Sequence, residues 1–197
     1  MADISAKDVA ALRKKTGASM MACKKALTES GGDADKAEVL LRQQDAKIAA
    51  KKSDRATEQG WIGHYVHGGR IGVLVEVACE TDFVAKNDKF QEFIRDVAMH
   101  ICALNPLALT PEDLDPGVVN REREVYLGQV QDKPENIREK IVEGKLQKFY
   151  ADNCLMNQAF VKDGDKTVQQ VLTEVIGTLG ENIVLKRFAR LELGGGE

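Results

Sequence analysis

Apolar residues recur at helical spacing through the first fifty residues and are separated by short polar breaks. Each apolar stretch begins at a residue type that caps helices, and the three candidates are Ser5, Ser19 and Asp33. The first two stretches end at glycines, which take the left-handed conformation of a helix end without strain: Gly17 and the pair Gly31-Gly32. This pattern predicts a compact module of three short helices over residues 1–52.

The pattern changes after the third predicted helix. From about Gln43 to Gln59 the chain is polar and basic, which indicates a solvated helix end that runs into a linker and marks a domain boundary. Residues Trp61 to His67 and Ile71 to Ala78 are rich in β-branched and aromatic side chains and are split by Gly68-Gly69. Because a glycine pair fits a tight turn, these residues predict a β-hairpin at the start of a second domain, residues 53–197.

Helical spacing returns further along this second domain. One apolar face is formed by Phe90, Phe93, Ile94, Val97, Ala98 and Ile101. Asn105-Pro106 ends that helix, because the residue before a proline disfavours the helical conformation. Two more periodic stretches, near 118–129 and 134–152, are separated by a short polar segment that ends in Pro134. They predict an antiparallel helical hairpin over residues 116–152.

The C-terminal part predicts a helix near 167–179, a break at Gly180 and a strand over 183–193. The order of elements therefore predicts an α+β fold. In this fold a three-helix module precedes a core that contains a β-hairpin, an antiparallel sheet and a helical hairpin.

The composition is that of an ordinary globular protein, with 43% hydrophobic and 30% charged residues and a net charge of −3. This balance favours neither disorder nor binding to polyanions. No apolar stretch approaches the roughly 20 residues needed to cross a bilayer, and the first residues lack a basic start followed by an apolar run. We therefore expect a cytoplasmic protein that does not bind membranes.

The residue types that carry catalysis are present but poorly arranged. The four cysteines have no paired spacing, which favours reduced, buried thiols and leaves one disulfide or an intersubunit bridge open: Cys23, Cys79, Cys102 and Cys154. His64 and His67 fall on opposite faces of a predicted strand and cannot chelate one metal ion. No phosphate-binding loop occurs. We therefore expect no cofactor and no metal site.

Two apolar features permit more than one interpretation. Phe83 and Phe90 are nearly two helical turns apart, so Phe83 can begin the apolar face of the following helix. A bulky ring at a junction between strand and helix can also be an exposed anchor for a partner. The consecutive Met20 and Met21 cannot both point inward on a narrow helical stripe, so either one is exposed or the module has a wide apolar face. Periodicity alone leaves both questions open.

Long segments of the chain resemble the elongation factor Ts family. The matching segments are Val9–Leu27 (VAALRKKTGASMMACKKAL), Gly31–Arg42 (GGDADKAEVLLR), Arg70–Phe90 (RIGVLVEVACETDFVAKNDKF) and Lys133–Phe149 (KPENIREKIVEGKLQKF). The resemblance implies an N-terminal module similar to ubiquitin-associated domains. It also implies a non-enzymatic exchange factor whose partner is the GTPase elongation factor Tu.

The same resemblance implies which residues meet the partner. In the family, the segment that corresponds to Thr81, Asp82, Phe83 and Val84 enters the GTPase domain, and its aromatic ring displaces a helix beside the magnesium site. Leu12, Met20 and Met21 are the corresponding contact candidates of the N-terminal module. Ser19 and Ala22 depart from the Gly and Asp that are commoner in the family.

Chain length carries a further implication of the resemblance. Longer members have a second hairpin subdomain in the core, and shorter members pair. The resemblance therefore implies a homodimer that buries a sheet edge or face.

Two other classes of function are open to the residues themselves. A helical module followed by a basic stretch, Lys47 to Arg55, is compatible with nucleic-acid binding, although the near-neutral charge argues against it. A cysteine-dependent enzyme centred on Cys79 is disfavoured because Glu80 and Asp82 raise the pKa of a nearby thiol.

Overall fold

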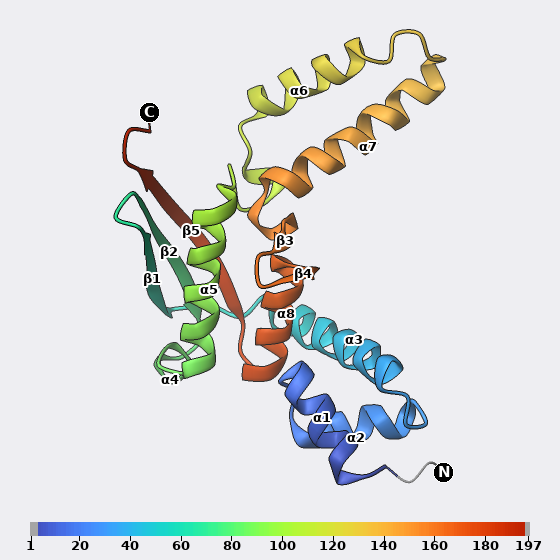
Figure 1. The fold of residues 1–197 in the computed structure, drawn as a ribbon, viewed down its shortest axis with the longest axis vertical. Coiled ribbons are helices and arrows are strands. Elements are labelled where there is room, and N and C mark those ends of the chain that lie inside the picture. The colour runs from blue at the N-terminus through green and yellow to red at the C-terminus, as the bar shows by residue number, and fades with distance from the viewer. Residues whose placement is uncertain (1–3, 196–197) are drawn as a thin grey trace. The chain divides into compact units, whose positions relative to one another are not determined.

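A computed structural model describes residues 4–195 and confirms the α+β fold (Figure 1). The helices are α1 (Ala6–Thr16), α2 (Met20–Glu29), α3 (Ala34–Lys52), α4 (Asp82–Ala85), α5 (Asp88–Leu104), α6 (Pro116–Gly128), α7 (Glu135–Asn153) and α8 (Val168–Leu179). The strands are β1 (Gln59–His67), β2 (Ile71–Cys79), β3 (Ala159–Phe160), β4 (Asp163–Thr167) and β5 (Ile183–Glu192). Within the described residues no helix is long and apolar enough to cross a membrane.

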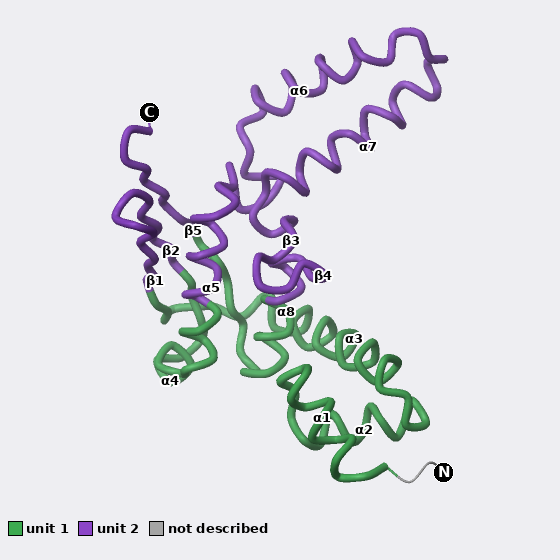
Figure 2. Tube along the Cα trace, viewed as in Figure 1, with its two compact units in different colours: residues 1–61, 77–93, 172–186 green, residues 62–76, 94–171, 187–197 purple. Residues whose placement is uncertain are grey.

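The chain folds into two compact units that are both assembled from separate segments (Figure 2). The first comprises the described residues up to 61 together with 77–93 and 172–186, and the second comprises 62–76, 94–171 and 187–195. This division crosses β1, β2, α5, α8 and β5. The division at residues 52 and 53 stays a prediction about domains.

The N-terminal module consists of α1, α2 and α3, and the predicted caps are present. The Ser5 hydroxyl accepts a hydrogen bond from the Asp8 amide (3.2 Å), and the Ser19 hydroxyl accepts one from the Ala22 amide (3.2 Å). Gly17 has φ 70° and donates its amide to the Arg13 carbonyl (2.8 Å), which ends α1. The module has its own small core: Val9, Leu12, Cys23, Ala26, Leu27, Ala37 and Leu41. Its likeness to ubiquitin-associated domains stays a prediction.

The predicted β-hairpin forms and belongs to a three-stranded sheet with the order β1-β2-β5. Its turn closes with a hydrogen bond from the Arg70 amide to the His67 carbonyl (2.9 Å), and Gly68 and Gly69 both have positive φ. One face of the sheet packs on α5. A Cβ at Gly63 would overlap Ile94 of α5, so glycine at this position permits the close approach of helix and strand.

Helix α5 buries the whole predicted apolar face, from Phe90 to Ile101. It ends at Asn105, which has φ 47° and donates its amide to the Ile101 carbonyl (3.0 Å) immediately before Pro106. Asparagine tolerates the left-handed conformation better than most residues, so the sequence correctly predicted the end of this helix.

The predicted helical hairpin consists of α6 and α7, which pack on each other (Figure 1). Val130, Val142 and Leu146 are buried between the helices, whereas Ile137, in the first turn of α7, is exposed. Arg138 holds the connecting loop by donating to the carbonyls of Lys133 and Gln131 (both 2.6 Å). The apolar stripe of α7 is thus buried in the middle of the helix and exposed in its first turn.

The short hairpin of β3 and β4 follows α7 and was not predicted. It packs around a buried imidazole, His100 of α5. The Val161 amide donates to His100 Nδ1 (3.1 Å), and His100 Nε2 lies 3.0 Å from Gln158 Oε1. Because a backbone amide can only donate, Nδ1 is the acceptor and Nε2 carries the proton. Burial lowers the pKa of His100 below its usual value.

Candidate partner-binding site

The segment Thr81–Val84 supplies the N-cap and the first three residues of α4 (Asp82–Ala85), a single helical turn between β2 and α5. Thr81 caps the turn, because its side-chain oxygen accepts a hydrogen bond from the Val84 amide (3.3 Å). The Asn87 amide donates to the Val84 carbonyl (2.9 Å) where the turn ends. The Asn87 side chain then accepts from the Lys89 amide (2.9 Å) at the start of α5. Local hydrogen bonds thus define the conformation of the whole junction.

Phe83 points away from the protein at this junction. Its residue surface is 78% exposed, whereas Val84 is 6% exposed and Ala85 is also buried. The interpretation of Phe83 as a core residue is therefore wrong. Its spacing from Phe90 does not place both rings on one face, because α4 ends at Ala85 and α5 starts anew at Asp88.

Asp82 is the other outward-facing residue of α4. Its carboxylate pairs with Lys86 (2.8 Å), and this hydrogen bond lowers the pKa of Asp82. Both side chains are largely exposed, so the pair adds little to stability.

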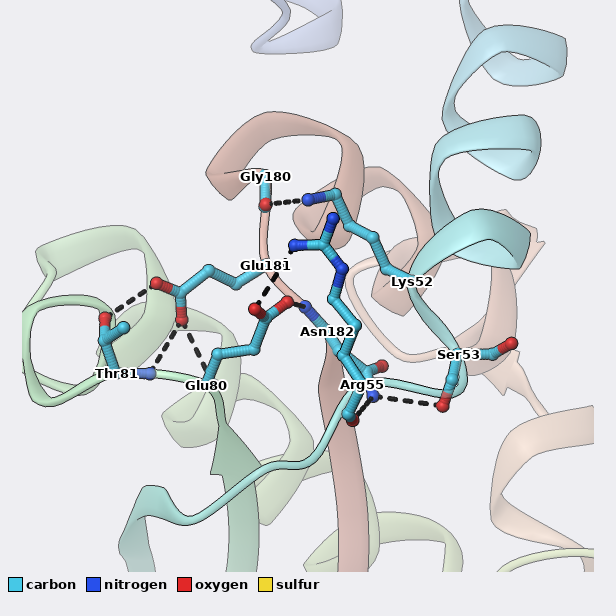
Figure 3. Close-up of polar contacts among 8 residues, drawn as sticks. All are labelled: Lys52, Ser53, Arg55, Glu80, Thr81, Gly180, Glu181 and Asn182. Atoms are coloured by element: carbon cyan, nitrogen blue, oxygen red, sulfur yellow. Dashed lines mark hydrogen bonds and ion pairs between the residues drawn. The ribbon is translucent and has the colours of Figure 1, made fainter.

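Two acidic residues join α4 to the loop between α8 and β5 (Figure 3). Glu181 accepts hydrogen bonds from the amides of Glu80 (3.1 Å) and Thr81 (3.0 Å) and from the Thr81 hydroxyl (2.6 Å). In return Glu80 accepts from the Asn182 amide (2.6 Å), and this bond lowers the pKa of Glu80. We call Glu80, Thr81, Glu181 and Asn182 the clasp.

The candidates in the N-terminal module divide into exposed and buried residues. Met20 and Met21, at the start of α2, are 50% and 74% exposed. Both methionines are therefore available for contact. Leu12 is 3% exposed and lies in the module core, where it supports α1 and α2.

A hydrogen bond links the N-terminal module to the helix that follows Phe83. The Lys89 ammonium donates to the Gly17 carbonyl (3.2 Å), at the end of α1. Lys89, Gly17 and Met20 line a shallow pocket of about 290 Å³. The other lining residues are Ala10, Arg13 and Lys14. The pocket therefore combines two apolar side chains with three cations. Lys89 was not predicted as part of any site.

The structure gives no support to the cysteine-enzyme alternative. Cys79 is buried, and burial raises the pKa of its thiol, with a further contribution from the Glu181 carboxylate. All four cysteines are buried free thiols, as predicted, so an intersubunit bridge would require one of them to become exposed. Among residues 4–195, no group of three or more His, Cys, Asp or Glu side chains could hold a metal ion.

Comparison with known proteins identifies close relatives along the whole described chain. The sequence model of a family described as Elongation factor TS matches residues 4–195. The elongation factor Ts of Geotalea daltonii is 56% identical over 196 residues, which cover 98% of this chain and 91% of that protein. That of Nitratidesulfovibrio vulgaris is 54% identical over 197 residues and 98% of each chain. That of Alkaliphilus oremlandii is 53% identical over 98% of this chain and 91% of its own.

Proposed function

Because the chain belongs to the elongation factor Ts family, and is therefore a translation elongation factor, we propose that it promotes release of GDP from elongation factor Tu. The observation that carries this proposal is the exposed ring of Phe83 on a turn whose conformation is defined by hydrogen bonds. A side chain held in this way can enter a partner without first losing much conformational freedom.

Phe83 acts as a wedge in this proposal. Burying a phenylalanine side chain contributes about 1.5–3 kcal/mol, and in the free protein most of that contribution is unused. Val84 and Ala85 anchor the base of α4, while Thr81 caps the turn and Asp82 is exposed beside Phe83 in sequence. The partner therefore supplies an apolar pocket that opens when the ring enters.

The ring promotes exchange by acting on the nucleotide's magnesium ion and not on the base. Magnesium bridges and neutralises the phosphates of a bound nucleotide, so moving the groups that hold the ion weakens the binding of GDP. The exchange factor must bind nucleotide-free Tu more tightly than GDP-bound Tu, and by linkage GDP weakens factor binding to the same degree. The chain itself makes and breaks no covalent bond.

The N-terminal module supplies a second contact in the proposal. Met20 and Met21 form its apolar part, and Leu12 contributes to the core that holds α1 and α2 together. The cations Arg13, Lys14 and Lys89 line the neighbouring pocket, so this contact fits a partner surface that combines apolar and acidic side chains. No direct contact with nucleic acid is proposed, in line with the net charge of −3.

The protein acts as a homodimer in this proposal. Gly63 and Val75 face α5, so alternation places Ile62 and Val66 of β1 and Leu74 of β2 on the opposite face of the sheet. Arg187 pairs with Glu76 on that opposite face (2.7 Å), which places Leu191 of β5 there too. These four apolar residues are exposed, and we call them the outer sheet face. A second copy is the proposed partner of this face.

The test of the exchange activity is release of a fluorescent GDP analogue from purified elongation factor Tu, with the chain added in substoichiometric amounts. We expect the wild type to accelerate release. Phe83→Ala should reduce the rate by roughly ten- to a hundredfold at subsaturating concentration. Val161→Ala removes an exposed apolar side chain elsewhere and should match the wild type.

Stability measurements separate a lost contact from a lost fold. Phe83→Ala should change the free energy of unfolding by less than about 0.5 kcal/mol, because the ring is exposed. Phe90→Ala removes a fully buried ring and should cost about 3–5 kcal/mol. If the wild type does not accelerate GDP release, the proposed function is wrong.

A further inference from the structure

We propose that Glu181 is a positioning residue for nucleotide exchange, whose carboxylate holds the α4 turn and thereby the ring of Phe83 in the orientation that the partner receives. This inference rests on the proposed function. Glu181 lies in the loop between α8 and β5, far from the Thr81–Val84 segment in sequence.

The geometry of Glu181 accounts for its role. One carboxylate oxygen accepts from two consecutive backbone amides, those of Glu80 and Thr81 (3.1 and 3.0 Å), and the other accepts from the Thr81 hydroxyl (2.6 Å). Two consecutive amides on one oxygen define the direction of the backbone where β2 ends. Hydrogen bonds to a charged acceptor are stronger than those between neutral groups, so the carboxylate stabilises this backbone conformation at the end of β2.

The hydroxyl of Thr81 connects Glu181 to α4 through two hydrogen bonds. Its proton is donated to Glu181, so a lone pair of the same oxygen is directed at the Val84 amide (3.3 Å). The cap of α4 and the clasp therefore share one atom, and hydrogen bonds in such a chain strengthen one another. Loss of the carboxylate frees the hydroxyl to rotate and loosens the turn on which Phe83 stands.

Glu181 is itself held by its neighbours. The adjacent amide of Asn182 donates to Glu80, and the Asn182 side chain donates to the carbonyls of Ser53 (3.2 Å) and Arg55 (2.8 Å). The Lys52 ammonium donates to the carbonyl of Gly180. The clasp therefore connects α4 to the segment that follows α3. The residues on both sides of Glu181, Gly180 and Asn182, are hydrogen-bonded to that part of the chain (Figure 3).

The clasp is needed because the ring of Phe83 has few contacts of its own. A wedge that samples many orientations must lose that freedom on binding, and this loss reduces the rate at which it enters a partner. Glu181 restricts the backbone below the ring while leaving the ring exposed. Its effect should therefore appear in exchange, together with a moderate loss of stability that leaves the protein folded.

The test combines Glu181→Gln with Phe83→Ala in the assay of fluorescent GDP release. The amide of glutamine keeps the size of the side chain but removes the charge and one acceptor. We expect Glu181→Gln to lower exchange at subsaturating concentration by about tenfold, because charged hydrogen bonds are lost. In the Phe83→Ala background, Glu181→Gln should lower the rate of GDP release by less than about twofold, since Glu181 acts through the ring of Phe83. Glu58→Gln, at an exposed acid, is the matched control and should behave as wild type.

A second measurement needs no partner. Amide hydrogen exchange of residues 81–87 should be faster in Glu181→Gln than in the wild type, at a temperature at which both proteins are folded. Thr81→Val, which removes only the hydroxyl, should resemble Glu181→Gln, and Thr81→Ser, which keeps it, should resemble the wild type.

The outcomes distinguish the two proposals. If the wild type accelerates GDP release and Glu181→Gln does so equally, only the role of Glu181 is wrong. The role of Glu181 is also wrong if Glu181→Gln slows GDP release by the same factor in the wild-type and Phe83→Ala backgrounds. It is wrong as well if Glu181→Gln leaves the amide protection of α4 unchanged. If the wild type itself fails to accelerate release, both proposals are overturned.

Discussion

The carboxylate of Asp45 on α3 lies directly against Gly177 of α8, where any side chain would overlap it. A Cβ built at Gly177 collides with the Oδ1, Cγ and Cβ atoms of Asp45. Glycine is disfavoured within helices, so its presence in the last turn of α8 reflects this close approach and not helix propensity.

Gly177→Ala should therefore destabilise the protein by about 1–3 kcal/mol, because the added methyl group forces α3 and α8 apart. Urea unfolding followed by circular dichroism measures the change. Gly144→Ala on α7 is the matched control, since a Cβ at that exposed position meets nothing within 4 Å. The control should stabilise the protein by up to about 1 kcal/mol through helix propensity. Equal stability of the two variants would show that the contact between Asp45 and Gly177 is loose.

Asp45 gives the stability of the protein a pH dependence of unusual sign. Burial, and secondarily the charge of Glu174, raise its pKa to about 6. The folded state therefore binds the proton more tightly than the unfolded state, whose aspartate has a pKa of about 3.9. Its contribution to stability is complete below the unfolded pKa and is lost as the pH rises through about 6.

Asp45→Asn should consequently stabilise the protein near pH 7.5 by roughly 1 kcal/mol, a value reduced for the partial exposure of the carboxylate. The gain should shrink as the pH falls towards the unfolded pKa. Unfolding free energies of both proteins at several pH values test the prediction. A gain that stays constant with pH would mean that Asp45 is ionised throughout.

His100 should produce the opposite dependence. Burial lowers its pKa, so protonation is harder in the folded state than in the unfolded state. The stability that the neutral ring supports is present above the unfolded pKa of about 6.5 and is lost as the pH falls through the folded pKa. Protonation would also place a proton on Nδ1, which accepts the Val161 amide.

Nitrogen chemical shifts of the imidazole measure this directly. They should show the tautomer protonated at Nε2, with a midpoint of titration below the ordinary histidine pKa of about 6.5. A His100 midpoint at or above about 6.5 would contradict the buried hydrogen bonds to Val161 and Gln158.

The outer sheet face leads to a prediction about assembly. Leu74→Lys places a charge at its centre, on the middle strand, and should convert the proposed homodimer to a monomer. Light scattering coupled to size-exclusion chromatography measures the mass. Leu107→Lys, at an exposed leucine outside the sheet, should leave the dimer intact. A monomeric wild type would exclude the homodimer, whatever the variants do.

Features that depend on neighbouring residues were predictable from the sequence. The caps at Ser5, Ser19 and Asp33 and the glycine stop at Gly17 rest on hydrogen bonds within a few residues. The turn at Gly68-Gly69 likewise needs only two residues with positive φ. The apolar face of α5 is strongly periodic, and the resemblance to the elongation factor Ts family depends only on the order of residues. These local and linear signals are sufficient to assign the fold class and the family.

Tertiary structure decided the orientation of Phe83 and brought Glu181 to the turn that carries it. Seven residues separate Phe83 from Phe90, and only the break between α4 and α5 turns the first ring outward. Glu181 bonds to an amide 101 residues away, and no local pattern encodes that pairing. The pairing of β5 with β2 and the two-residue strand β3 are likewise long-range or too short to be periodic. Sequence periodicity reports which face of one element is apolar, whereas a site assembled from separate segments exists only after the chain has packed.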